Sequence, residues 1–426
     1  MTTCMGLTYS FTLIYMTESK RKALQIGEIL RVEIEKVAHG GHFIARHEGA
    51  VIFVRHAIPG EIVEVRITGL DKSFARGDVI AVIEASPARV NAPCEYAGNC
   101  GGCDFQHIAI DKQRELKSEV IAEQFARISK MEVDVVVEEV SPALHWRTRY
   151  AASSNVSGEL GFSAIRSNTV IPISSCPVLI PDIDFPSLSR ERIGKSKRIE
   201  VAISSSGERS VAVMDVRKGR EEKRPEVTII EGGDFLNYEV SSAEGVRNYQ
   251  VSQSSFWQSN INAPEKLVEA VLDFANLQLG EHLLDLYGGV GLFAGAALPL
   301  IGSQGRIDII EGSSIATSDA RRNFESEANV YIHTGDVAKA IRSVATADVI
   351  VLDPPRTGAG KPVIESLVKI KPRAIIYVAC DPAALARDTG YLQELGYHLE
   401  AIRAFDLFPM THHIEAVALY SPRKVS

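Results

Sequence analysis

The chain has no excess of positive charge, few cysteines and no apolar run long enough to span a membrane. Its 426 residues include 46 basic and 54 acidic ones, so the formal net charge is -8. Binding of nucleic acid by bulk charge alone is therefore not expected, although a local basic surface stays compatible with this balance. The 6 cysteines are too few for a disulfide scaffold. We identify no signal peptide, and we expect a cytoplasmic protein without a membrane partner.

Changes of pattern divide the chain into four expected segments, since domains average roughly 150 residues. Residues 1–23 are expected to be an N-terminal extension. Residues 24–87 contain short alternating strands and glycine turns, which predict a small barrel of the OB type. Residues 88–250 mix helix and strand. Residues 251–426 alternate helices with apolar strands, which predicts a Rossmann-like α/β domain on a parallel sheet.

One stretch of the central segment is locally basic. Between Arg190 and Arg224 there are 11 basic and 6 acidic residues. This excess is typical of a solvated loop and also of a surface that contacts RNA phosphates. The sequence leaves both interpretations open.

The last segment places two motifs at the ends of expected strands. The motif DLYGGVG (residues 285–291) ends a strand and begins a helix, and its glycines permit a tight turn and close approach of a ligand. Glu311 ends the next strand, where its carboxylate can accept hydrogen bonds from ribose hydroxyls. This pattern predicts a nucleotide-type ligand without deciding between NAD and S-adenosylmethionine. The motif DPPR (residues 353–356) follows another strand and directs Asp353 into the same crevice.

Two further residues have the chemistry of catalysis. Cys380 follows an apolar strand and precedes a Pro-led helix, and we expect the helix N-terminus and Arg387 to favour a thiolate there. A buried structural cysteine is the alternative. Glu415 lies among apolar residues, which raise the pKa of a carboxyl group and suit it to proton transfer.

Four cysteines suggest a metal centre. Cys94, Cys100 and Cys103 lie in the segment CEYAGNCGGC, and Cys176 follows in SSCPV. Four thiolates hold either a tetrahedral zinc ion or a 4Fe–4S cluster, and their spacing alone does not decide between the two. Separately, Gln258 lies among aromatic residues in QSSFWQSNINAP, a segment that suits the mouth of the crevice or a packed linker.

Taken together and in order, these motifs resemble those of the TRAM-domain, iron–sulfur-containing RNA 5-methyluridine methyltransferases. The resemblance runs from about residue 24 to residue 422 and rests on the barrel pattern and the motifs CEYAGNCGGCDFQH, SFWQSN, LDLYGGVGLFA, DPPRTG, ACDPAALARD and FPMTHHIE. It implies a TRAM barrel, a central mixed α+β iron–sulfur domain and a C-terminal class I methyltransferase domain.

The resemblance also implies roles for individual residues. The residues that match the 4Fe–4S ligands are Cys94, Cys100, Cys103 and Cys176, which favours iron over zinc. The residues that match the S-adenosylmethionine contacts are Gln258, Tyr287, Glu311 and Asp353. Cys380 matches the nucleophile and Glu415 the general base. Two positions depart from the pattern: Asp381 and Met410 stand where the family often has Asn and His, and the charge of Asp381 lies near the expected thiolate.

The function implied is C5-methylation of a uridine in structured RNA by a monomeric enzyme. Uracil C5 is a poor nucleophile, and addition of a thiolate to C6 activates it. We expect ribosomal RNA as the partner, with transfer RNA as an alternative. A non-catalytic RNA-binding iron–sulfur protein would not need Cys380 and Glu415, and an NAD-dependent oxidoreductase would not need the DPPR motif.

Overall fold

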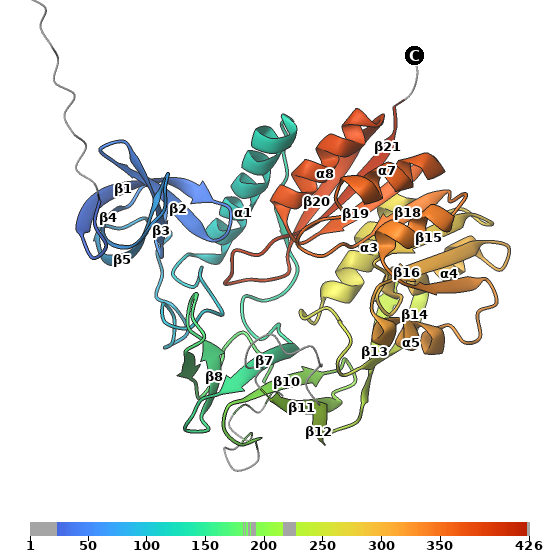
Figure 1. Cartoon of the computed structure of the whole chain (residues 1–426), viewed down its shortest axis with the longest axis horizontal. Helices are drawn as coiled ribbons and strands as arrows, with labels where there is room; N and C mark the ends of the chain where they lie inside the picture. Colours follow the sequence, from blue (N-terminus) through green and yellow to red (C-terminus); the bar gives the residue numbers. More distant parts are fainter. Residues whose placement is uncertain are drawn as a thin grey trace, which may run out of the picture.

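The computed structural model describes residues 24–423 apart from 182, 184, 186–187, 189–192 and 216–226. The expected extension, with Cys4, lies outside the described residues, as does part of the basic stretch from 190 to 224. The described chain forms a barrel, a central antiparallel sheet, a two-stranded hairpin and one large sheet, with the barrel set to one side (Figure 1). No helix in this part of the chain is both long and apolar enough for a membrane crossing.

Five strands close into a barrel in the order β1-β2-β3-β5-β4. Their bounds are β1 Ile29–Ala38, β2 His42–His47, β3 Ala50–Arg55, β4 Ile62–Leu70 and β5 Ala75–Glu84. Alternate residues of β1 and β4 are buried, Val32 and Val63 among them, because successive side chains of a strand point to opposite faces. Closure leaves the sheet without a free edge. The predicted small barrel is thus confirmed.

The central sheet has the strand order β12-β11-β10-β7-β8-β9. Its strands are β7 Arg149–Ser154, β8 Leu160–Ser163, β9 Val170–Pro172, β10 Lys197–Ile203, β11 Arg209–Asp215 and β12 Val227–Glu231. The separate hairpin consists of β13 Phe235–Ser242 and β14 Gly245–Ser252. Its buried Tyr249 donates a hydrogen bond to the Leu292 carbonyl at 2.9 Å, so the hairpin packs against the large sheet's own helices.

The large sheet has the order β17-β16-β15-β18-β19-β21-β20-β6. Its strands are β6 Val137–Glu139, β15 His282–Leu286, β16 Arg306–Glu311, β17 Val330–Thr334, β18 Val349–Leu352, β19 Ala374–Ala379, β20 Tyr397–Asp406 and β21 Glu415–Pro422. The five strands from β15 to β19 are parallel, whereas β21 is antiparallel to both of its neighbours. The predicted α/β class is confirmed.

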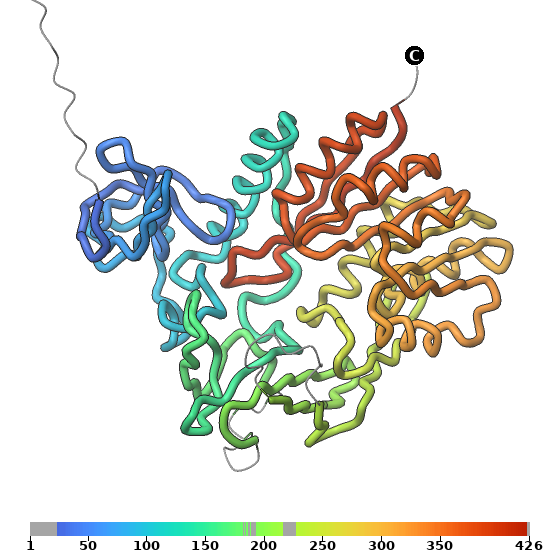
Figure 2. The backbone as a smooth tube through the Cα atoms, in the orientation of Figure 1, coloured from blue at the N-terminus to red at the C-terminus, as the bar shows by residue number. Residues whose placement is uncertain are grey.

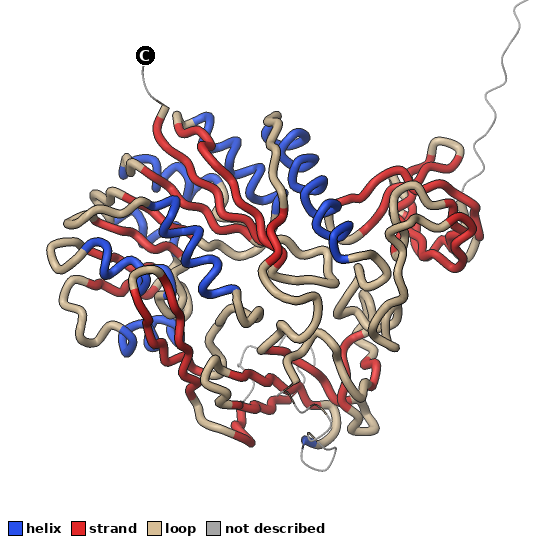
Figure 3. Tube along the Cα trace, turned by 180° about the vertical axis from the view of Figure 1, so that it is seen from behind, coloured by secondary structure: helices blue, strands red, loops and turns tan. Residues whose placement is uncertain are grey.

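Helices cover this sheet (Figure 3). They are α3 Ala263–Ala275, α4 Leu292–Ile301, α5 Ser314–Asn323, α6 Val337–Ala340 with a 3-10 turn η2 Ile341–Ser343, α7 Lys361–Ile370 and α8 Pro382–Glu394. The four residues of β18 are all buried, and Val349 and Ile350 belong to different apolar clusters. The sequence of a strand that is buried on both faces is a continuous apolar run. The apolar run of β18 therefore indicates a buried strand from the sequence alone.

Helix α1, Ile110–Gln124, continues into a short π-helical turn η1, Phe125–Ser129, and lies between the barrel and the large sheet (Figure 1). One continuous apolar cluster includes Val65 of the barrel, Leu116 of α1 and Leu385 of α8. The barrel is therefore packed on the rest of the protein through a shared core. The loop that joins β20 and β21 reaches from the large sheet toward the barrel and α1 (Figure 2).

Candidate active site

The candidate site lies where the strand order of the large sheet reverses. The chain runs outward from β15 to β16 and β17 on one side and to β18 and β19 on the other. Ligands of open α/β sheets bind beyond the carboxyl ends of the strands at such a reversal. The loops that leave β15 and β18, residues 287–291 and 353–356, flank this point. Both sequence motifs are therefore brought together as neighbours.

The loop after β15 has an unusual backbone. Tyr287, Gly289 and Gly291 have φ values of 59°, 54° and 92°, in the left-handed region that glycine adopts without strain. Gly291 precedes the first residue of α4, and a Cβ atom there would collide with the ring of Phe324. The loop thus presents backbone to the crevice.

Two acids support this loop. Glu311 accepts hydrogen bonds from the backbone nitrogens of Gly289, at 3.1 Å, and Ser313, at 2.6 Å. A carboxylate has about four acceptor positions, so acceptor capacity remains for a ligand. Asp285 is fully buried; its Oδ2 accepts from the Ala294 nitrogen at 3.2 Å, while its Oδ1 has no hydrogen-bond partner among the described residues.

Burial and the nearby charges of Asp353 and Glu311 raise the pKa of Asp285 to about 8, although the Ala294 hydrogen bond opposes the shift. A buried oxygen without a partner costs stability unless a ligand or water satisfies it. Asp285 is a site residue that sequence reasoning quoted in its motif and did not single out.

Strand register brings Cys380 and Glu415 together. Ala379 of β19 pairs with Ala416 of β21 in the antiparallel ladder. Cys380 follows Ala379 and Glu415 precedes Ala416, so the two side chains leave neighbouring strands at the same end of the sheet. Because β18 is the other neighbour of β19, Asp353 also emerges at this end.

The charges of these groups act on one another. Burial, with the charges of Glu415 and Asp353, raises the pKa of Cys380 to about 12, and Arg356 opposes that shift. Burial raises the pKa of Asp353 to about 7. Burial and the charge of Asp353 raise the pKa of Glu415 well above its usual value, and Arg356 again opposes them. These shifts favour a protonated thiol at neutral pH, and they favour a proton on the carboxyl pair of Asp353 and Glu415.

The expectation that the helix N-terminus and Arg387 favour a thiolate is wrong, because the pKa of Cys380 is raised and Arg387 is not among the main charges that act on it. Its guanidinium pairs with Asp388 at 2.7 Å and donates to the Thr357 carbonyl at 2.9 Å. Arg356 supplies the positive charge instead. The mistake follows from spacing, since Arg387 lies on the helix after Cys380 but its side chain turns to its own neighbour.

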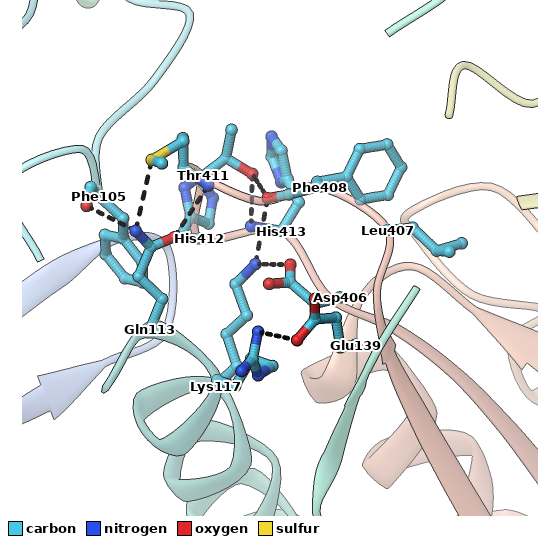
Figure 4. A network of polar contacts seen from close by, with 12 residues as sticks. Phe105, Gln113, Lys117, Glu139, Asp406, Leu407, Phe408, Thr411, His412 and His413 are labelled. Atoms are coloured by element: carbon cyan, nitrogen blue, oxygen red, sulfur yellow. Dashed lines mark hydrogen bonds and ion pairs between the residues drawn. The ribbon is translucent and has the colours of Figure 1, made fainter. Parts of the chain in front are cut away.

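The loop between β20 and β21, residues 407–414, is held by α1 (Figure 4). Lys117 pairs with Asp406 at 2.6 Å and donates to the Phe408 carbonyl at 3.1 Å. The Gln113 side chain accepts a hydrogen bond from the Met410 nitrogen at 2.9 Å. Because Glu415 follows this loop directly, α1 fixes the approach to the candidate base.

A second anchor of the same loop comes from the cysteine segment. Asp104 accepts a hydrogen bond from the His412 nitrogen at 2.9 Å and bonds the His412 ring. His413 is half-buried; burial and the charges of His412 and Arg356 lower its pKa to about 3. His412 and His413 therefore lie beside the candidate site, and hydrogen bonds to Asp104 hold His412.

Among the expected cofactor contacts, Gln258 comes from the segment that precedes α3. It is buried and lines a cavity of about 200 Å³ together with Thr148, Tyr238 and Asn260. Within the described chain, Tyr287, Glu311 and Asp353 do not border that cavity. Asn260 donates a hydrogen bond to the Leu407 carbonyl at 2.8 Å, so this segment reaches the loop before Glu415.

Four cysteines surround one cavity of about 270 Å³: Cys94, Cys100, Cys103 and Cys176. Burial, with the charges of Cys176 and Cys100, raises the pKa of Cys103 to about 12, and a hydrogen bond with Gln106 opposes that shift, so these thiols lie within electrostatic reach of one another. No three His, Cys, Asp or Glu side chains of the described residues are grouped closely enough to ligate a single ion. The thiols therefore line a cavity and do not converge on one point.

Comparisons with known proteins agree with this arrangement. Residues 23–80 match the TRAM domain family, and residues 337–423 match the tRNA (Uracil-5-)-methyltransferase family. An uncharacterized RNA methyltransferase of Streptomyces avermitilis is 39% identical, over 93% of this chain and 99% of that protein. The 23S rRNA (uracil(1939)-C(5))-methyltransferase RlmD of Shewanella denitrificans is 30% identical, over 95% of this chain and 98% of its own.

The fold also matches a solved structure along its length. The tRNA (uracil-54, C5)-methyltransferase of Pyrococcus abyssi, crystallised with S-adenosyl-L-homocysteine, superposes with a TM-score of 0.70. The match covers 92% of this chain and 100% of that one at 22% identity. At this identity the likeness establishes the shared fold.

Proposed function

The chain belongs to the RNA uracil-5-methyltransferase family, and from this premise we propose that it methylates C5 of a uridine in ribosomal RNA. S-adenosylmethionine is the proposed methyl donor, Cys380 the nucleophile and Glu415 the base. The observation that carries the proposal is the register of β19 and β21, which sets this thiol and this carboxyl group at one end of the sheet.

The reaction begins at the thiol. Cys380 loses its proton to solvent as its Sγ forms a bond to C6 of the uracil ring, and the electron pair of the C5–C6 double bond moves into the ring as an enolate. The positive charge of the Arg356 guanidinium favours the Cys380 thiolate, because it opposes the effect of the nearby carboxylates on the pKa of this thiol. In the proposed reaction, the same charge favours the enolate that forms next. S-adenosylmethionine, when bound, supplies an electrophilic methyl group. C5 forms a bond to this methyl carbon as the bond between the methyl and the donor's sulfur breaks, the electron pair staying on that sulfur to give the thioether. C5 then bears both the methyl and its original hydrogen.

Glu415 completes the reaction. As a carboxylate it removes the C5 proton; the electrons of that bond re-form the C5–C6 double bond, and the bond from Sγ to C6 breaks. Burial and Asp353 raise the pKa of Glu415, which makes its carboxylate a stronger base than a solvated one. The contacts of Lys117 and Gln113 with the preceding loop support the backbone that leads to Glu415.

The residues around the strand reversal fit a nucleoside-type methyl donor. Glu311 retains acceptor positions for ribose hydroxyls, and the half-buried Tyr287 borders the same loop. Buried Asp285 Oδ1 lacks a partner that a polar ligand or water would supply. Asp353 and Gln258 are further proposed contacts of the donor. Support for Gln258 comes from the resemblance alone.

The four cysteine thiols fit a 4Fe–4S cluster better than one metal ion. A zinc site needs four sulfurs at about 2.3 Å from a single point. The described residues have no such group, and the thiols instead surround a cavity of about 270 Å³. Cys94, Cys100, Cys103 and Cys176 would hold the cluster by thiolate ligation. No electron is needed for methyl transfer, so we assign the cluster a structural role beside the Asp104 anchor.

The proposed substrate is 23S ribosomal RNA, because an RlmD protein matches nearly the whole chain. The target uridine has to leave its stack to reach Cys380. Transfer RNA is the second candidate, since the C-terminal family match carries that name. Mapping of 5-methyluridine in total RNA from cells with and without the gene tests the proposal. Loss of one 23S site supports it, loss at a tRNA position selects the alternative, and an unchanged map contradicts both.

A further inference from the structure

One turn of the barrel touches both loops that carry the proposed catalytic residues. The turn joins β1 to β2 and consists of His39, Gly40 and Gly41. Nothing in the proposed chemistry uses these residues. Their position, far from the large sheet in sequence, needs another explanation.

The first contact is with the residue that follows the nucleophile. His39 Nε2 lies 3.1 Å from Asp381 Oδ2, and the two side chains are 37% and 24% exposed. The other oxygen, Asp381 Oδ1, accepts a hydrogen bond from the Ala384 nitrogen at 2.8 Å and so caps α8. Asp381 thus uses one oxygen to begin the helix and the other to bind the barrel.

The second contact is with the loop before the base. Gly41 has φ +76°, and a Cβ atom there would collide with Asp104 and would lie 2.9 Å from His412 Nδ1. Only glycine allows the turn to sit this close to the Asp104–His412 pair. The turn therefore contacts residues 380–381 through His39, and at Gly41 it lies close to residues 407–414.

We propose that His39 is a positioning residue for the nucleophile: it pairs with Asp381, fixes the loop that carries Cys380 and offsets the carboxylate beside the thiol. The barrel then contributes to the reaction by positioning the nucleophile. Without His39, the Oδ2 atom of Asp381 loses its partner, and the carboxylate charge disfavours a thiolate at the adjacent residue. This inference rests on the proposed role of Cys380.

A double-mutant cycle tests the proposal in the full-length enzyme. The variants are His39→Ala, His39→Gln, Asp381→Asn and the pair His39→Ala/Asp381→Asn, with His47→Ala at the end of β2 as control. Asparagine still caps a helix but has no charge. The measurements are kcat and KM for methyl transfer to an RNA transcript, and the rate at which iodoacetamide alkylates Cys380, read by mass spectrometry at one pH.

We expect His39→Ala to lower kcat and the alkylation rate about tenfold, the equivalent of one pKa unit, with an unchanged KM for RNA. Glutamine, which still donates a hydrogen bond, restores most of the loss, and His39→Ala has no further effect on Asp381→Asn. The proposal would be overturned if His39→Ala raised only KM or had wild-type rates. It would also be overturned if His39→Ala lowered the rates equally in the wild-type and in the Asp381→Asn protein. If the wild-type enzyme methylates no RNA, the proposed function fails, while the alkylation rates still test the His39–Asp381 coupling.

Discussion

Lys117 and Asp406 form an ion pair at 2.6 Å in which the two side chains are only 1% and 2% exposed. Lys117 belongs to α1, and Asp406 is the last residue of β20, immediately before the loop that ends at Glu415. The pair is therefore part of the support of the candidate base. Burial lowers the pKa of Lys117, and the charge of Asp406 opposes that shift. If one partner is removed, the other is left as an unpaired buried charge, which destabilises the folded protein.

Removal of one partner tests this support. Lys117→Met leaves Asp406 as a buried charge, and we expect a loss of about 3–5 kcal/mol in the free energy of unfolding in urea. Lys112→Met, on a more exposed face of the same helix, should change it by no more than about 0.5 kcal/mol. In the double variant Lys117→Met/Asp406→Leu, stability should return while kcat stays low, because the anchor at the Phe408 carbonyl is still missing. Full activity in the stable double variant would show that the pair does not position the loop.

We expect the charge of Arg356 to influence the pH range of activity. Its guanidinium opposes the raised pKa of both Cys380 and Glu415, so Arg356→Gln raises both pKa values further. Both groups act in their deprotonated forms, and activity therefore rises with pH through these pKa values. We expect kcat/KM of Arg356→Gln to rise at a higher pH than that of the wild type. At pH 7, kcat/KM should fall about tenfold for each pKa unit by which either group is raised. Arg356→Lys should restore much of it. A profile of unchanged shape and lower height would refute the electrostatic role.

The cysteine cavity predicts an iron cofactor. Protein purified without oxygen should be brown and carry about four irons per chain, and Cys103→Ser should lose them. Cys4→Ser is the matched control, because that cysteine has no assigned role. The readouts are iron analysis and the visible spectrum. A colourless protein with one zinc per chain would overturn the cluster assignment.

The sequence predicted those parts of the site that depend on local order. The loop 285–291, Asp353 and Cys380 each follow an apolar strand, and parallel strands end at one edge of a sheet, so their grouping follows from the pattern. The pairing of Ala379 with Ala416 does not follow from local order alone. It depends on the topology of the sheet, in which β21 lies between β19 and β20.

Contacts between distant segments were not predictable in this way. Lys117 and Asp406 are separated by 289 residues, and no periodicity links them. Arg387 is near Cys380 in the sequence, but the guanidinium that opposes the raised pKa of Cys380 belongs to Arg356, which follows a different strand. The charge of Asp381 is evident from the sequence, whereas its partner His39 comes from the barrel. Side-chain direction and domain packing decide such contacts, and a single sequence records neither.

The most direct test of the central claim is the covalent state of Glu415→Gln with RNA and S-adenosylmethionine. Without the base, the reaction should stop after methyl transfer, with the methylated uridine bound to Cys380 Sγ. We predict an RNA adduct that survives a denaturing gel, maps by mass spectrometry to the Cys380 peptide, and is absent from Cys380→Ala/Glu415→Gln. Normal turnover by Glu415→Gln without an adduct, or an adduct on another residue, would contradict the assignment of Cys380 as nucleophile and Glu415 as base.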